Sequence, residues 1–297
     1  MDQPIRLTGP SDADIPVWLV TQNDIASWLS DQSQAVQAWV ASHRFQAKPG
    51  AHLILPGEAG AVAGVVLGIG DPLGLWDTAG LPAALGPGTY RLEIDPKSAT
   101  QAALGWALGC YQFSRYKDPG ESDNARDPAL LAWPEGADRA YVERAAAAAW
   151  LVRDLVNTPA DDLGPQELSE AAVKVAQAFG ATSKVIVGDD LLKSKYPMIH
   201  AVGRGAAQEP RLIDLLWGDP ANPAVTLVGK GVCFDSGGLD LKTANGMALM
   251  KKDMGGAATA LGLAHMIMDA ALPVRLRVLI PAVENAVSAA SYHPGDV

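Results

Sequence analysis

The chain has 297 residues, of which 48% are hydrophobic, and its 33 acidic and 23 basic residues give a formal charge of −10 at pH 7. This length and composition predict two domains with sizeable cores, and no apolar run is long enough to span a membrane. The negative charge argues against broad, nonspecific binding to nucleic acid, because such binding needs a basic surface.

Residues 1–136 are predicted to form a small α/β domain. Apolar alternation predicts its strands, and a longer pattern with helical spacing follows them. The strands are expected at 17–21, 52–55, 61–67 and 90–94, and the helix at 98–116. Residues 117–135 are rich in Pro, Asp and Gly, which predicts a linker with an added strand near 129–133. No catalytic motif falls in this domain.

Residues 137–157 are predicted to form a linking helix, because alanine, the best helix former, dominates them. From 158 to 297, helices and strands alternate, which predicts a second α/β domain with a mixed, largely parallel sheet flanked by helices. Its strands are expected at 184–187, 199–202, 212–217, 225–228 and 274–280. Sheets of this kind bind ligands at the carboxyl ends of their strands.

Charged residues in a glycine-rich frame mark the segment 228–259, which reads VGKGVCFDSGGLDLKTANGMALMKKDMGGAAT. Asp235 ends a strand there, and the glycines after it allow a sharp turn and the close approach of ions and substrate. Asp253 stands just before a predicted helix start. Hard divalent cations prefer carboxylate ligands, and a pair of ions needs a carboxylate that bridges them. The segment therefore predicts a metal site with Asp235 as the bridge and Asp253 as a second ligand.

Two lysines in the same segment are candidates for different roles. Lys230 could bind a metal only as the free amine, because an ammonium group has no lone pair, and burial with nearby cations would favour that form. Lys242 would keep its proton and polarise a carbonyl or stabilise an oxyanion.

The spacing of these four residues resembles the signature of the leucyl aminopeptidase (cytosol aminopeptidase) family of di-zinc exopeptidases. Asp235 lies 5, Lys242 12 and Asp253 23 residues after Lys230, in the register of that family. The resemblance also covers 151–160, 201–205, 210–212, 284–285 and 292–296. It makes residues 158–297 the metal-binding part of an incomplete catalytic domain.

The resemblance implies a role for each matching residue. Lys230 and Asp253 would bind one metal ion, Asp235 would bridge two, Lys242 would contact the scissile carbonyl, and Met250 would line the pocket for the first side chain. It further implies two divalent ions, Zn²⁺ or Mn²⁺, with bicarbonate as a further component of the complete enzyme. The substrate would be a peptide with a leucine-like N-terminal residue, and the assembly a homohexamer.

Two features depart from the family pattern. Gly246-Met247-Ala248 stands where the family has Asn-Met-Asp, which affects the expected lining and lid of the pocket. The chain stops at Val297, before the family's Asn-Thr-Asp-Ala-Glu-Gly-Arg segment with two more carboxylate ligands and the arginine for bicarbonate. We therefore expect the chain alone to be inactive and to hold at most a single ion tightly. We expect it to be a fragment or half of a split enzyme, and the alternative is a noncatalytic homologue or subunit acting in binding or assembly.

Three other interpretations of the segment are weaker. Asp235-Ser236-Gly237-Gly238 is similar to the nucleophile tetrapeptide of trypsin-like proteases, but none of the five histidines lies in a partner motif. Gly229-Lys230-Gly231 lacks the spacing and the hydroxyl residue of a phosphate-binding loop. A structural ion pair between Lys230 and Asp235 is the main alternative to a metal site.

The compartment is predicted from the N-terminus and the cysteines. The chain begins Met1-Asp2-Gln3-Pro4, without the charged and apolar regions of a secretory signal. Cys110 and Cys233 are its only cysteines, so no disulfide framework is expected. Both features fit a reducing cytoplasm.

Overall fold

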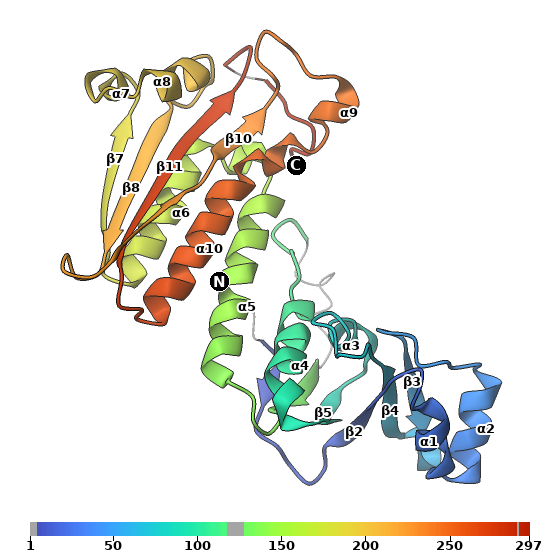
Figure 1. The fold of residues 1–297 in the computed structure, drawn as a ribbon. Helices are drawn as coiled ribbons and strands as arrows, with labels where there is room; N and C mark the ends of the chain where they lie inside the picture. Colours follow the sequence, from blue (N-terminus) through green and yellow to red (C-terminus); the bar gives the residue numbers. More distant parts are fainter. Residues whose placement is uncertain (1–4, 118–127, 290) are drawn as a thin grey trace. The chain divides into compact units, whose positions relative to one another are not determined.

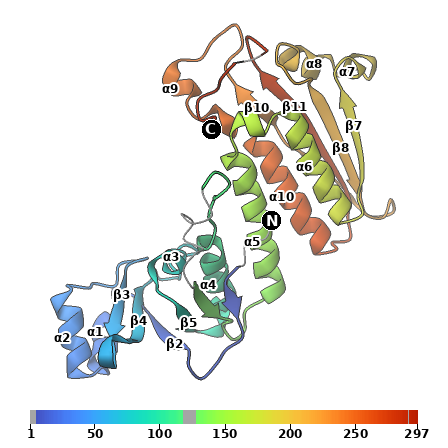
Figure 2. The same cartoon turned by 180° about the vertical axis from the view of Figure 1, so that it is seen from behind.

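A computed structural model describes residues 5–117, 128–289 and 291–297. The chain divides into two compact units, Met1–Ala146 and Ala147–Val297, which Figures 1 and 2 show from opposite sides. Each unit has a sheet of its own. Within the described residues, no helix is long and apolar enough to cross a membrane.

The first unit is built on a six-stranded sheet in the order β1-β6-β5-β2-β4-β3. Only the edge pairing of β3 with β4 is antiparallel. Val65, Val66 and Leu67 of β4 are fully buried, a continuous apolar run typical of a strand covered on both faces. The strands are β1 (Leu7–Thr8), β2 (Ile15–Val20), β3 (His52–Pro56), β4 (Val62–Gly68), β5 (Gly88–Glu93) and β6 (Ala129–Ala132).

Helices of the first unit pack on this sheet through small and aromatic side chains. The longest is α4 (Pro96–Gly109), which begins where the Asp95 carboxylate accepts a hydrogen bond from the Lys97 N–H at 2.9 Å. Trp106 of α4 is fully buried beside Tyr90 of β5. The others are α1 (Ile25–Ser30), α2 (Gln34–Ser42), α3 (Leu81–Ala84) and the short 3₁₀ turn η1 (Glu58–Gly60).

The second unit is organised around its longest strand, β11 (Arg275–Asn285). On one side β11 pairs antiparallel with β8, which pairs antiparallel with β7. On the other side it pairs parallel with β9 through residues 275–279 and with β10 through residues 282–285. The remaining strands are β7 (Thr182–Val187), β8 (Arg211–Trp217), β9 (Ala224–Val228) and β10 (Gly231–Asp235).

Helices α6 and α10, with the part of α5 that follows Ala146, form the helical side of this unit's core, and Figures 1 and 2 show them beside the sheet. Leu168 of α6, Leu261 of α10 and Ile280 of β11 are fully buried in one core cluster. That core fixes the carboxyl end of β10, where the candidate site lies. The helices are α5 (Arg139–Asn157), α6 (Pro165–Ala178), α7 (Asp190–Lys193), α8 (Pro197–Gly203), α9 (Ala244–Met247) and α10 (Gly255–Asp269), with 3₁₀ turns η3 (Ala160–Asp162) and η4 (Met250–Met254).

The structure confirms the α/β class, the mixed sheet and most expected strands, including the added strand β6. The sheet of the second unit is less parallel than expected, because β8 pairs antiparallel with both β7 and β11. The strand expected at 199–202 is wrong, because these residues belong to α8. Short apolar runs do not separate strand from helix, and Pro197 in the first turn favours a helix. Helix α4 ends at Gly109, earlier than expected, before a run of residues with lower helix propensity. Part of the predicted linker, 118–127, lies outside the described residues.

Candidate metal centre

Strand β10 delivers Asp235 to its carboxyl end. Cys233 and Phe234 are buried just before it, and Asp235 stands opposite Asn285 in the parallel register with β11. The chain then turns through Gly237 and Gly238, whose φ values of 93° and 68° fall in the left-handed region that favours glycine. The turn expected from the two glycines is therefore formed.

The Asp235 carboxylate uses its two oxygens differently. Oδ1 accepts hydrogen bonds from the Gly237 N–H at 2.9 Å and from Asn285 Nδ2 at 2.8 Å. Oδ2 lies 3.2 Å from the Lys242 ammonium Nζ. Burial raises the pKa of Asp235, but the Gly237 N–H, the Asn285 amide and Lys242 together lower it further, so its pKa lies below the ordinary value. Asp235 is accordingly an anion at neutral pH.

Lys230 and Asp253 form a second ion pair, in which Lys230 Nζ donates to Asp253 Oδ2. Lys230 lies between β9 and β10, and Asp253 lies in η4. The two segments meet because the Lys230 carbonyl accepts the Ala257 N–H at 2.9 Å. A Cβ on Gly229 would lie 2.6 Å from the Ala257 Cα, so glycine is required for the start of α10 to pack this closely.

The structure therefore gathers the four charged residues singled out from the sequence into two lysine–aspartate pairs. Lys230 is paired with Asp253 rather than with Asp235, so the simple ion pair considered as an alternative does not form. Met250, proposed to line the substrate pocket, is half-buried at the start of η4.

The donor set fits part of a metal coordination sphere. Asp253 and Asp235 each form an ion pair with a lysine ammonium group. Both carboxylates therefore stabilise a positive charge beside them. Two hard carboxylates and one amine, once Lys230 loses its proton, are ligands that Zn²⁺ or Mn²⁺ accepts. In the part of the chain that the structure describes, no three His, Cys, Asp or Glu side chains form a metal-binding group. The fit thus depends on the lysine as well as the two aspartates.

Ser236 does not have the surroundings of a serine nucleophile. Its hydroxyl donates to the Asn285 carbonyl at 2.7 Å. That hydrogen bond holds the turn against the end of β11. The contact gives the serine a structural role, and the protease-like interpretation of the tetrapeptide gains no support.

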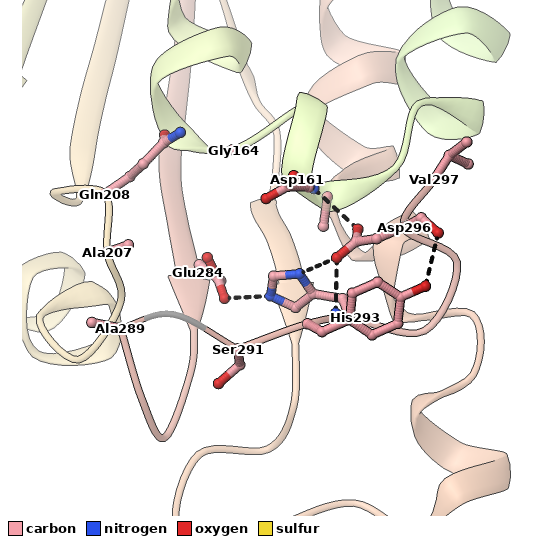
Figure 3. Close-up of a pocket in the computed structure, with 12 residues that line it drawn as sticks. Asp161, Gly164, Ala207, Gln208, Glu284, Ala289, Ser291, His293, Asp296 and Val297 are labelled. Atoms are coloured by element: carbon pink, nitrogen blue, oxygen red, sulfur yellow. Dashed lines mark hydrogen bonds and ion pairs between the residues drawn. The ribbon is translucent and has the colours of Figure 1, made fainter. Parts of the chain in front are cut away.

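A second polar cluster lines a cavity of about 350 Å³ in the same unit (Figure 3). The His293 ring lies between two carboxylates, with Nε2 2.8 Å from Glu284 Oε1 and Nδ1 2.9 Å from Asp296 Oδ2. Burial lowers the pKa of His293, but its bonds to Glu284 and Asp296 raise it more, so the pKa lies above the ordinary value. The ring also packs 4.6 Å from the Phe234 ring, centroid to centroid.

Sequence reasoning assigned no individual role to Asn285 or His293. Both lie in stretches noted for their resemblance to the family, but the contacts that define them form only when the chain folds. Asn285 is 50 positions from Asp235, and His293 is 9 positions from Glu284. A single sequence carries no direct signal for such pairs.

Comparison with known proteins covers both units. The model of the cytosol aminopeptidase family catalytic domain matches residues 150–297, and that of the M17 aminopeptidase N-terminal domain matches residues 15–134. A probable cytosol aminopeptidase of Chlamydia abortus is 48% identical over 151 residues, which cover 50% of this chain and 30% of that protein. The match therefore spans less than a third of this relative, and a longer match, to a probable cytosol aminopeptidase of Methylorubrum extorquens at 33% identity, covers 89% of this chain and 58% of that protein.

Solved structures align with nearly the whole chain. A cytosol aminopeptidase from Coxiella burnetii superimposes with a TM-score of 0.87 at 46% identity, over 98% of this chain and 63% of that one. The bottromycin maturation enzyme BotP in complex with Mn aligns with a TM-score of 0.75 at 32% identity, over 92% and 60%. The fold of both units is thus that of these enzymes, while part of each enzyme has no counterpart in this chain.

Proposed function

Because the chain belongs to the cytosol aminopeptidase family, we propose that its protein is a metal-dependent aminopeptidase that removes a leucine-like N-terminal residue from peptides. The observation that carries this proposal is the pair of lysine–aspartate contacts at the two ends of β10, Lys230 with Asp253 before its first residue and Lys242 with Asp235 at its last. Asp235 and Lys242 stand at the carboxyl end of a sheet strand, a position that suits ligand binding.

The residues proposed to hold metal are Lys230 and Asp253 for one ion, with Asp235 as the bridge to a second. The candidate ions are Zn²⁺ and Mn²⁺, and the complex of BotP with Mn supports the latter. When bound, two such ions would supply Lewis acidity and activate a water molecule. A bicarbonate ion is proposed only for the complete enzyme.

Lys242 is the residue proposed to act on the substrate carbonyl. Its side chain is 32% exposed, and its ammonium group forms an ion pair with Asp235 Oδ2 at 3.2 Å. A positive group held beside the ligand carboxylate needs little movement to donate to a carbonyl oxygen. Met250 would provide an apolar wall for the first side chain, and the negative net charge would modestly favour encounter with peptide amines.

The assembly and compartment are proposed from the resemblance to the family. We propose a homohexamer in the cytoplasm, a compartment in keeping with the names of the cytosol aminopeptidases that the chain resembles. Cys110 and Cys233 are both buried and free, which is compatible with a reducing compartment.

The direct test is hydrolysis of leucyl-p-nitroanilide by the natural gene product. Activity should require added Mn²⁺ or Zn²⁺ and be abolished by a chelator. Lys242→Ala should lower kcat by about 10²–10³, the cost of removing an oxyanion-stabilising group. The matched control is Lys252→Ala, an exposed lysine in η4, which should keep wild-type kcat.

Two outcomes would contradict the proposal. Turnover that survives complete removal of metal would exclude the two-metal mechanism. A metal-loaded natural product without peptidase activity would favour a noncatalytic role in binding or assembly.

A further inference from the structure

We infer that Asn285 is a positioning residue that orients the Asp235 carboxylate for metal binding. The inference rests on the proposed metal site and adds to it a residue that does not touch the metal itself. Asn285 is the last residue of β11, directly opposite Asp235 of β10. The two strands therefore place the amide and the carboxylate side by side.

Asn285 holds the turn after β10 with both its side chain and its backbone. Its Nδ2 donates to Asp235 Oδ1 at 2.8 Å. Its carbonyl accepts the Ser236 N–H at 3.0 Å and the Ser236 hydroxyl at 2.7 Å. The side-chain contact acts on the carboxylate alone, whereas the backbone contacts act on the turn.

Two donors on Oδ1 decide which way the carboxylate faces. A free aspartate rotates broadly about its last torsion, but the Asn285 amide and the Gly237 N–H both bind the same oxygen. Oδ2 is left directed at Lys242, where the site concentrates positive charge. The metal-facing oxygen is thus selected before any ion arrives.

Gly238 leaves room for the amide oxygen of Asn285, and the contact with Asp235 sets the orientation of the amide. A Cβ on Gly238 would lie 2.8 Å from Asn285 Oδ1, and its φ of 68° also favours glycine. The Asn285 oxygen can therefore occupy the side facing Gly238 while its NH₂ faces Asp235. The flipped amide would set its oxygen against a carboxylate oxygen, a repulsive contact without a hydrogen bond.

Asn285 would hydrogen-bond to a metal ligand without touching the metal. Loss of a residue in such a position typically weakens metal affinity 10- to 100-fold. Removing the Asn285 amide should leave Asp235 in place on its strand but with its carboxylate less firmly oriented, by the Gly237 N–H and Lys242 alone. The expected effect is weaker metal binding without a matching loss of fold stability.

The test compares Mn²⁺ dissociation constants, measured by isothermal titration calorimetry, for wild-type chain, Asn285→Ala and Asn285→Leu. Asn285→Leu keeps the side-chain volume but cannot donate. Both variants should raise the Kd for Mn²⁺ about 10- to 100-fold.

Ser236→Ala is the matched control. It removes the hydrogen bond from the Ser236 hydroxyl to the Asn285 carbonyl but leaves both donors on Asp235. It should change the Kd for Mn²⁺ by less than about threefold. Thermal unfolding without metal should give similar midpoints for Asn285→Ala and Ser236→Ala.

Three results would overturn the inference. A folded Asn285 variant with wild-type Kd would show that the amide does not orient the ligand. An equal loss in Ser236→Ala would assign the effect to the turn. Unfolding of both Asn285 variants would make Asn285 a structural residue. A wild-type chain that binds no Mn²⁺ is distinguishable from these, because it contradicts the metal site itself.

Discussion

At the residue scale, Asp235 shows how a charged side chain is kept at the end of a buried strand. Burial alone would favour its neutral form. A backbone N–H, a side-chain amide and an ammonium group outweigh that effect. A carboxylate surrounded by donors remains ionised, and an ionised carboxylate is the form that binds metal.

His293 should make the stability of the chain depend on pH. Its pKa is raised in the folded state, so the folded chain binds this proton more tightly than the unfolded chain. The stabilisation is therefore fully present below the unfolded value of about 6.5 and is lost as pH rises through the folded value. His293→Gln should lower the thermal midpoint more at about pH 6 than at about pH 9.

The control for this prediction is His43→Gln. The His43 ring contacts the Trp39 carbonyl and the Ser42 hydroxyl, so this substitution removes an imidazole without removing a contact to a carboxylate. Thermal unfolding of the three proteins at constant ionic strength is the measurement. A His293→Gln effect of the same size at both pH values would disprove the imidazolium bridge between Glu284 and Asp296.

The two cysteines should be unreactive in the native chain. Burial raises the pKa of Cys110 to about 12, with a small opposing effect of Arg6, and burial also raises the pKa of Cys233. Since the thiolate is the reactive form, Ellman's reagent should label neither thiol before unfolding and both in guanidinium chloride. Rapid labelling of the native protein would contradict the burial of these side chains.

At the element scale, the candidate site depends on how closely helices approach their neighbours. Gly262 of α10 lies against α5, and a Cβ there would meet Val152 Cγ2 at 2.6 Å and the Ala148 carbonyl oxygen at 3.1 Å. Glycine at this position allows α10 to approach α5 closely. The start of α10 packs in turn on the backbone of Lys230.

Gly262→Leu should therefore overpack this contact and lower the free energy of unfolding by about 1–3 kcal/mol, despite the better helix propensity of leucine. Urea unfolding followed by circular dichroism is the measurement. Leu263→Ala, at the neighbouring, 45% exposed position, is the control and should change stability by no more than about 0.5 kcal/mol. An unchanged midpoint for Gly262→Leu would show that α10 and α5 are not in close contact.

The elements also show what the sequence could predict. Strand β4 and the turn at Gly237-Gly238 were predictable, because apolar runs and glycines act locally. Part of helix α8 was expected as a strand at 199–202, since a run of four residues is too short to distinguish the two periodicities. The antiparallel pairings of β7 and β8 were not predicted either, because strand direction depends on contacts between distant segments.

At the scale of the whole molecule, every residue of the candidate site comes from the second unit. Lys230, Asp235, Lys242 and Asp253 were identified from the sequence because their spacing in one short segment matches a family signature. Asn285 and His293 were not assigned roles, because their partners are distant in the chain or become neighbours only after folding. The sequence therefore predicted the charged groups, and the structure adds the residues that hold them.

The most direct test of the central claim is Mn²⁺ binding to the purified chain, measured by isothermal titration calorimetry with Asp235→Asn/Asp253→Asn as the comparison. We predict a single tightly bound ion in the wild-type chain, no tight binding in the double variant, and unchanged binding in Asp214→Asn, whose carboxylate pairs with Arg277. Equal binding by wild type and the double variant, or none by wild type, would contradict the account.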